Sequence, residues 1–246
     1  MNGRNYSEAL QRYAGKVSSK HNEELINFLA KRSINRIYHF THIDNLISIL
    51  NYGLLSRDFM TRKQLPFVFT DDQRLDELQD TICCSLSIAN YYMLNRKIEQ
   101  LGNYFVVLEF GSTALLFKKF ACFPSNAARS DLKKLAKETP SNFVGAVGLA
   151  GMFLNREVRA EYNVPVSVPT DVQAELMFFE PIPLASLRKI HIPLGTSQDT
   201  LNIVAQIENK YDELEIEYNC TESHFNREVG SSQFYKRRWS MDWRNL

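Results

Sequence analysis

The chain has 246 residues, of which 44% are hydrophobic and 23% charged, with 29 Lys and Arg against 28 Asp and Glu. This length and composition fit one sizeable globular domain and exclude a disordered, coiled-coil or collagen-like chain. A net charge of +1 provides no chain-wide positive field. Any contact with nucleic acid must therefore rest on local clusters of basic residues.

The first residues lack the apolar run of a signal peptide, and the longest apolar-plus-glycine stretch, 144–154, is too short to span a bilayer. Four cysteines, at positions 83, 84, 122 and 220, form no Cys-x-x-Cys pair. We therefore expect reduced thiols in a soluble, cytoplasmic protein that makes no membrane contact.

The first third of the chain predicts helix, strand and helix. Residues 1–36 form a polar segment with one apolar helical stripe, which predicts an N-terminal helical extension. Residues 37–40 favour a short aromatic strand. Thr41 and Asp44 then have the spacing of a helix cap, and Gly53 stands where a left-handed residue ends a helix.

The remaining segments predict several short strands with few long helices between them, which favours a mixed α+β fold over alternating β and α units. Alternating apolar residues make 81–88 a half-buried strand, and Gly145, Gly148 and Gly151 indicate a flexible segment or close packing. The predicted strands are 67–69, 81–88, 104–110, 172–179 and 187–193, and the predicted helices are 131–137 and 199–215.

Glu175 is the single charge in the apolar strand 172–179, so it must either be desolvated or face a cavity. One interpretation is a structural ion pair with Arg74, Arg156 or Arg159. The other is a functional carboxylate, which the proline-bounded loop before the strand favours. The residues alone leave both open.

Other candidate residues also have two readings. His39, beside a predicted helix start, could bind an anionic or hydroxyl-bearing ligand, or could be a hydrogen-bonded core histidine. Arg74 is flanked by acids and suits a surface salt bridge. His39 and His42 need not converge and have no cysteine partner or His-Glu-x-x-His motif, so we expect no metal site. The basic and aromatic residues 234–239 could bind single-stranded nucleic acid or form a solvated tail.

Three stretches together are similar to one family. Residues 37–54, Ile-Tyr-His-Phe-Thr-His-Ile-Asp-Asn-Leu and onward to Gly53-Leu54, resemble the opening of the DarT family of DNA ADP-ribosyltransferase toxins. Residues 72–93 and the triplet Asn126-Ala127-Ala128 resemble the guanine-modifying branch of that family. Residues 169–176, Pro-Thr-Asp-Val-Gln-Ala-Glu-Leu, resemble the segment that ends the substrate loop and presents the catalytic glutamate.

The resemblance implies an ADP-ribosyltransferase-like split β-sandwich with peripheral helices, occupying residues 37–246, with 196–246 peripheral. It implies transfer of ADP-ribose from NAD to a base of single-stranded DNA. Guanine is favoured over thymine because an insertion of the thymine branch is absent. It also implies a toxin neutralised by an antitoxin with a macrodomain or a related ADP-ribosyl hydrolase.

The resemblance also assigns site residues. A buried carboxylate that holds the ribose 2′-hydroxyl would stabilise the positive charge that develops as the nicotinamide bond breaks. The implied catalytic residues are Glu175 and Arg74, and those implied for NAD binding are His39, Thr41, Asn45, Gly53 and Arg74. The implied DNA contacts are Asn163, Thr170, Gln173, Arg237 and Arg238.

Three alternatives stay open. The same enzyme could modify thymine, RNA or protein. The chain could instead be a non-enzymatic module that binds single-stranded nucleic acid through its C-terminal basic residues. A metal-dependent hydrolase that uses His39, His42 and Glu175 ranks last.

Overall fold

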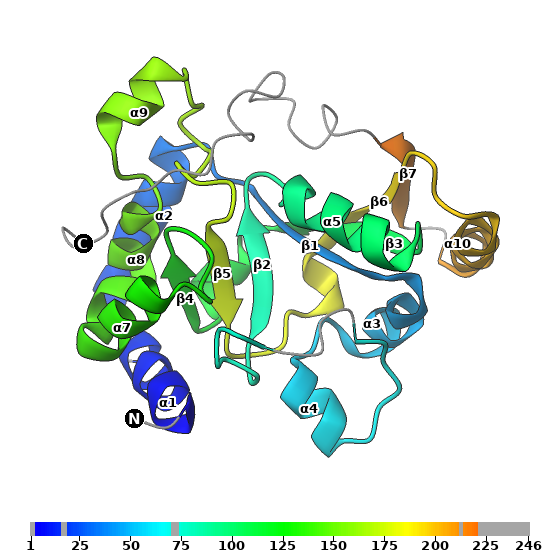
Figure 1. The fold of residues 1–246 in the computed structure, drawn as a ribbon, viewed down its shortest axis with the longest axis horizontal. Helices are drawn as coiled ribbons and strands as arrows, with labels where there is room; N and C mark the ends of the chain where they lie inside the picture. Colours follow the sequence, from blue (N-terminus) through cyan, green and yellow to red (C-terminus); the bar gives the residue numbers. More distant parts are fainter. Residues whose placement is uncertain (1–2, 16–18, 70–73, 212–213, 221–246) are drawn as a thin grey trace.

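A mixed β-sheet forms the centre of the protein (Figure 1). The computed structural model describes residues 3–15, 19–69, 74–211 and 214–220. Within them, seven strands follow the order β4-β5-β2-β1-β3-β6-β7. Neighbouring strands are antiparallel except for the parallel pair β6 and β7. The strands are β1 (Arg36–His42), β2 (Ile82–Leu86), β3 (Phe105–Gly111), β4 (Phe120–Phe123), β5 (Glu175–Phe178), β6 (Leu187–Pro193) and β7 (Glu215–Cys220).

The sheet divides within the five-residue strand β2. Residues 85 and 86 pair with β1, whereas residues 82–84 pair with β5 on the other side. Strands β1 and β2 are therefore joined over only two residue pairs before they separate. The predicted α+β class with a split sheet and peripheral helices is confirmed.

Helices cover the sheet and both of its ends. They are α1 (Gly3–Ala14), α2 (Ser19–Lys31), α3 (Leu46–Tyr52), α4 (Arg57–Arg62), α5 (Tyr91–Leu101), α6 (Ala114–Phe117), α7 (Ser130–Glu138), α8 (Gly145–Gly151), α9 (Arg156–Glu161) and α10 (Gln198–Lys210), with the 3-10 turns η1 (Ile43–Asn45), η2 (Pro140–Phe143) and η3 (Leu184–Ser186). Helices α1, α2, α7 and α8 gather near β4, and α10 lies near β7 (Figure 1). No helix in the described ranges is long and apolar enough to cross a membrane.

The N-terminal helices pack into the apolar core. Tyr6 and Leu10 of α1 are fully buried against β4 and β5, in a cluster that includes Phe123 and Met177. Leu25 and Leu29 of α2 join the larger cluster on the other side. Burial of large side chains of this kind contributes about 2 kcal/mol each, so both helices stabilise the fold that carries the pocket described below.

Several predicted elements are confirmed. The alternating segment 81–88 contains β2, in which Ile82, Cys84 and Leu86 are buried and the residues between them are partly exposed. Helix α3 ends at Tyr52, and Gly53 follows with φ of 80°. Gly148 provides the predicted close packing, because an added Cβ would lie 2.4 Å from the carbonyl carbon of Phe143.

Other predictions were wrong in detail. Residues 67–69 form no strand, because the backbone of Val68 hydrogen-bonds to the side chain of Asn45 rather than to a neighbouring strand. The turn before α3 is capped by His42, whose Nδ1 accepts from the Asp44 N–H, and Thr41 is not the cap. The strand expected over 172–179 is only Glu175–Phe178, since Asp171 begins a turn. Strands β4 and β7 and helix α5 were not predicted.

Candidate active site

A cavity of about 640 Å³ opens where β1 and β2 separate, within the range of about 300 to 1,000 Å³ typical of ligand sites. Its walls come from β1, α3, α4, β2, α5 and the start of β5. Seven of the residues assigned by sequence line this one cavity: His39, Thr41, Asn45, Gly53, Arg74, Gln173 and Glu175.

Glu175 is the first residue of β5, is partly buried and lines this cavity. The backbone N–H of Ala127 donates to its Oε2 at 2.8 Å. Burial raises the pKa of Glu175 from 4.5 to about 7, against the opposing effects of the Ala127 bond and the charge of Arg74. The carboxyl group therefore exchanges its proton near neutral pH, which suits an acid–base role.

The triplet Asn126-Ala127-Ala128 fixes the position of this carboxyl group. The Oδ1 of Asn126 accepts from the N–H of Ala128 at 2.9 Å, which forms a tight turn and directs the Ala127 N–H toward Glu175. Asn126 and Ala128 also line the cavity. The sequence identified the triplet by resemblance only, and its contact with Glu175 joins residues 48 positions apart.

Arg74 lines the cavity and also forms an ion pair with Asp76. Its side chain is 13% exposed, and its Nη2 lies 2.8 Å from an Asp76 carboxylate oxygen. Nη2 also donates to the Leu78 carbonyl at 2.9 Å. Burial alone would lower the pKa of Arg74, but Asp76 raises it, so the guanidinium stays charged. Among the described residues, Nη1 makes one long hydrogen bond, of 3.4 Å to the Thr81 carbonyl.

His39 connects β1 and β2 where their backbone pairing stops. Its Nδ1 lies 2.8 Å from the Cys83 carbonyl oxygen, and because a carbonyl only accepts, this nitrogen carries the proton. Burial lowers the pKa of His39, which favours the neutral ring. The Nε2 atom then has a free lone pair, so His39 can accept a hydrogen bond from a ligand in the cavity.

Asn45 anchors part of the cavity wall. Its side-chain amide exchanges two hydrogen bonds with the backbone of Val68, at 2.7 and 3.0 Å, and its Nδ2 also donates to the Thr41 hydroxyl at 3.0 Å. We call residues 66–69 the wall segment. Because these bonds occupy both ends of the amide, Asn45 positions the wall segment and Thr41 supports Asn45.

Gly53 allows α3 to approach the segment after β5. A Cβ at this position would lie 2.7 Å from the Ile182 carbonyl oxygen, and φ is 80°. The next residue, Leu54, exchanges backbone hydrogen bonds with Ile182. Gly53 therefore closes one side of the cavity through its backbone.

The residues predicted to contact DNA do not all line the cavity. Gln173 lines the cavity two residues before Glu175, and Asn163 is exposed at the start of the loop. The prediction that Thr170 contacts DNA was wrong, because this residue is 1% exposed and its hydroxyl donates to the Leu154 carbonyl at 2.6 Å. The buried side chain of Thr170 therefore stabilises the loop between α9 and β5 and is not accessible to DNA. Arg237 and Arg238 lie outside the described residues.

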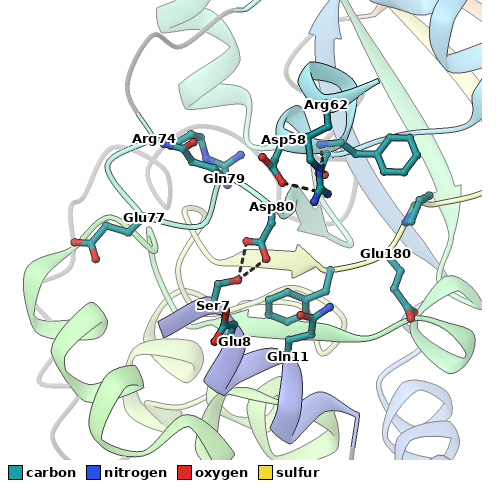
Figure 2. A pocket seen from close by; sticks show the side chains of 14 residues that line it. Ser7, Glu8, Gln11, Asp58, Arg62, Arg74, Glu77, Gln79, Asp80 and Glu180 are labelled. Carbon is teal, nitrogen blue, oxygen red and sulfur yellow. Dashed lines mark hydrogen bonds and ion pairs between the residues drawn. The ribbon is translucent and has the colours of Figure 1, made fainter. Parts of the chain in front are cut away.

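A second pocket of about 820 Å³ lies below the loop that carries Arg74 (Figure 2). Ser7 of α1 donates to both carboxylate oxygens of Asp80 at 2.6 and 2.7 Å, and Asp58 pairs with Arg62. Five acids line this pocket against two arginines, so it is a poor site for phosphates. No pattern in the sequence indicated the contact between α1 and Asp80. The acids are Glu8, Asp58, Glu77, Asp80 and Glu180.

The proposed metal ligands do not converge. His42 pairs with Asp44 and stacks on Tyr104, away from Glu175, which bonds to Ala127. In the described part of the chain, the one group with metal-like spacing is His191, Glu217 and Cys220 at β6 and β7. None of these three lines the cavity. The arrangement gives no support to a hydrolase built on His39, His42 and Glu175.

Helix α5 contributes cavity residues to which the sequence analysis assigned no role. Tyr92, Arg96 and Lys97 line the cavity, and Tyr92 is 42% exposed. An exposed ring and two cations suit the aromatic and phosphate parts of a nucleotide. Detecting them requires knowing that residues 91–101 form a helix, which was not predicted from the sequence.

The chain was compared with known proteins. The family model described as "ssDNA thymidine ADP-ribosyltransferase, DarT" matches residues 38–220. No curated protein sequence matches the chain. A structure of Thermus sp. 2.9 DarT with ADP-ribosylated ssDNA is 17% identical, with 78% of this chain and 97% of that chain covered and a TM-score of 0.49.

Two further solved structures are similar. Thermus sp. 2.9 DarT with NAD+ is 18% identical, with 77% of this chain and 96% of that one covered and a TM-score of 0.46. Thermosipho africanus DarTG with ADP-ribose is 15% identical, with 77% of this chain covered and a TM-score of 0.48. The chain spans 50% of the length of that DarTG chain. Because the family model matches well over half of its residues, the chain belongs to the DarT family of ssDNA ADP-ribosyltransferases.

Proposed function

We propose that the chain transfers ADP-ribose from NAD to a base, preferentially guanine, in single-stranded DNA. The observation that carries this proposal is Glu175, a carboxyl group with a pKa near 7 at the wall of a cavity that also holds Arg74 and a neutral His39. Family membership supports the same reaction.

In this mechanism the bond between nicotinamide and the ribose C1 breaks, and a bond forms between C1 and a nitrogen of the base. Nicotinamide leaves with the bonding electrons, so positive charge develops on the ribose. Ionised Glu175 stabilises that charge through the ribose 2′-hydroxyl. The base loses one proton, which Glu175 accepts and passes to water.

The other cavity residues bind NAD. Arg74 offers its Nη1 edge to a phosphate oxygen. The Nε2 of His39 accepts from the nicotinamide amide or a ribose hydroxyl, and Tyr92 provides an exposed ring for stacking. Gln173 has an amide side chain at the Glu175 end of the cavity, where the base enters.

A base can reach Glu175 only after it leaves the stack, which makes single-stranded DNA the substrate of lower energetic cost. The preference for guanine rests on the resemblance of residues 72–93 and 126–128 to the guanine-modifying branch, whereas the family model's description names thymidine. The side-chain amide of Gln173 can hydrogen-bond to the donor and acceptor groups of either base. The choice between guanine and thymine therefore depends on the residues around Gln173.

The test incubates the protein and its Glu175→Ala variant with NAD and single-stranded oligonucleotides of each base composition, and measures product mass. We expect the mass of one ADP-ribose unit to be added to guanine-containing strands only, and none with the variant. Modification of thymine strands alone would overturn the base assignment. NAD left intact with every strand would overturn the reaction, and near-wild-type transfer by the variant would overturn the role of Glu175.

We also propose that the chain is the toxin of a toxin–antitoxin pair and acts in the cytoplasm, where it meets NAD and DNA. Modified bases would block copying of the strand, and a macrodomain or related ADP-ribosyl hydrolase would restore them. Induced expression should stop growth, and a co-expressed macrodomain hydrolase should restore it. Growth arrest that persists with Glu175→Ala would contradict this role.

A further inference from the structure

Two arginines from distant parts of the chain meet on one aromatic ring beside the substrate loop, residues 163–172. Arg32 follows the last residue of α2, and its guanidinium carbon lies 4.1 Å from the centroid of the Phe153 ring. Arg159 belongs to α9, and its guanidinium carbon lies 5.3 Å from the same centroid. The two guanidinium carbons are therefore less than about 10 Å apart, beside the same ring.

Both arginines hold the substrate loop through neutral acceptors. Arg159 donates from Nη1 to the Val168 carbonyl at 2.8 Å and from Nη2 to the Pro165 carbonyl at 2.8 Å. Arg159 also bonds to the Thr170 hydroxyl at 3.1 Å. Arg32 donates from Nη1 to the Val166 carbonyl at 3.0 Å. None of these acceptors neutralises a positive charge.

Within the described ranges, neither arginine forms an ion pair with a carboxylate. The nearby acids of α9, Glu157 and Glu161, are exposed and pair with neither of them. Burial, and to a smaller extent the positive charge of Arg32, lower the pKa of Arg159 to about 10. Burial also lowers the pKa of Arg32. An anion bound between the two would relieve both effects.

The pair also has hydrogen-bond donors left to bind such an anion. A guanidinium carries five N–H groups, of which Arg159 uses three and Arg32 one in the contacts above. Arg32 is partly exposed, and the Val166 side chain beside it is 61% exposed. An anion can therefore approach from solvent.

We propose that Arg32 and Arg159 bind a backbone phosphate of the single-stranded DNA and set the position of the strand along the substrate loop. The loop leads from α9 to Gln173 and Glu175 at the start of β5, so a strand held at one end presents a neighbouring base at the other (Figure 1). Arg32 lies before the residues matched by the family model, 38–220. The inference rests on the proposed function and adds to it a DNA contact supplied by the N-terminal helices.

The experiment measures binding of a fluorescent single-stranded oligonucleotide by anisotropy, at NaCl concentrations between about 50 and 300 mM. The variants are Arg32→Gln and the matched control Lys31→Gln, which removes the same charge from the exposed neighbouring residue. We expect Arg32→Gln to weaken binding about fivefold to tenfold at low salt and to reduce the salt slope by about 0.7, the value for one phosphate contact on a single strand. Lys31→Gln should change neither.

Arg32→Lys separates phosphate binding from loop support, because lysine keeps the charge but not the fork-shaped donor set. It should restore most of the salt slope. Release of nicotinamide in the absence of DNA by Lys31→Gln should equal that of the wild type. An Arg32→Gln slope equal to that of the wild type overturns the inference, and so does an equal loss with Lys31→Gln. Failure of the wild type to modify any strand would instead overturn the proposed function.

Discussion

Substituting Glu175 by glutamine should make the protein inactive and, at alkaline pH, more stable. Glutamine keeps an oxygen that accepts the Ala127 N–H but removes the buried charge. The pKa of Glu175 rises from 4.5 to about 7 on folding. At about 1.36 kcal/mol for each pH unit, this difference corresponds to about 3 kcal/mol.

The direction in which stability changes with pH follows from proton linkage. Because folded Glu175 holds its proton more tightly than the unfolded chain does, this contribution to stability is complete below pH 4.5 and is lost as the pH rises through 7. Glu175→Gln avoids that loss. We expect its free energy of unfolding to exceed that of the wild type by about 3 kcal/mol at pH 8 and by less than about 1 kcal/mol at pH 5.

Urea denaturation of both proteins at pH 5 and pH 8 measures this difference, with Glu99→Gln, at an exposed glutamate of α5, as the control. The gain at pH 8 should also raise Tm by about 6 °C or more. An equal stability difference at both pH values would refute the assignment of the raised pKa to Glu175. Wild-type transfer should increase as the pH rises through about 7, where the carboxylate forms.

Three further substitutions test the cavity and the core. Asn45→Ala removes the two bonds to the wall segment, so the KM for NAD should increase about tenfold with little change in kcat; an unchanged KM would contradict the anchoring role. Arg74→Lys cannot reproduce the forked contact with Asp76, so transfer should fall about tenfold or more per folded molecule, and a loss of stability alone would leave Arg74 structural. Gly148→Ala forces a Cβ against the Phe143 backbone and should lower the free energy of unfolding by about 3 kcal/mol in urea titrations, and a neutral effect would show that α8 can shift.

The segments that could be predicted from the sequence carry a local signal. Alternating apolar residues identify β2, and Gly53 marks the end of α3, because burial and backbone conformation act within a few neighbouring residues. Strand β4 was missed because its four residues are all buried, which removes the alternation. Residues 67–69 have strand-forming side chains, but the amide of Asn45 binds their backbone instead.

The candidate site was recognised through resemblance more than through physical pattern. An isolated glutamate in an apolar strand indicates burial, but the partner that holds it, Ala127, is 48 residues away and has no side-chain signal. The same limit applies to Arg32 and Arg159, which meet only because α2 and α9 pack at the same end of the sheet. Contacts of this kind depend on tertiary structure, and composition and periodicity do not encode them.

The division within β2 has a consequence for how the enzyme can diversify. His39 is bonded to the backbone of Cys83, and Cys83 is also paired with Met177 of the strand that Glu175 begins. Strand β2 thus contacts both His39 and the strand that carries Glu175. The spacing between His39 and Glu175 is therefore set by the sheet and does not depend on the loops and helices around the cavity.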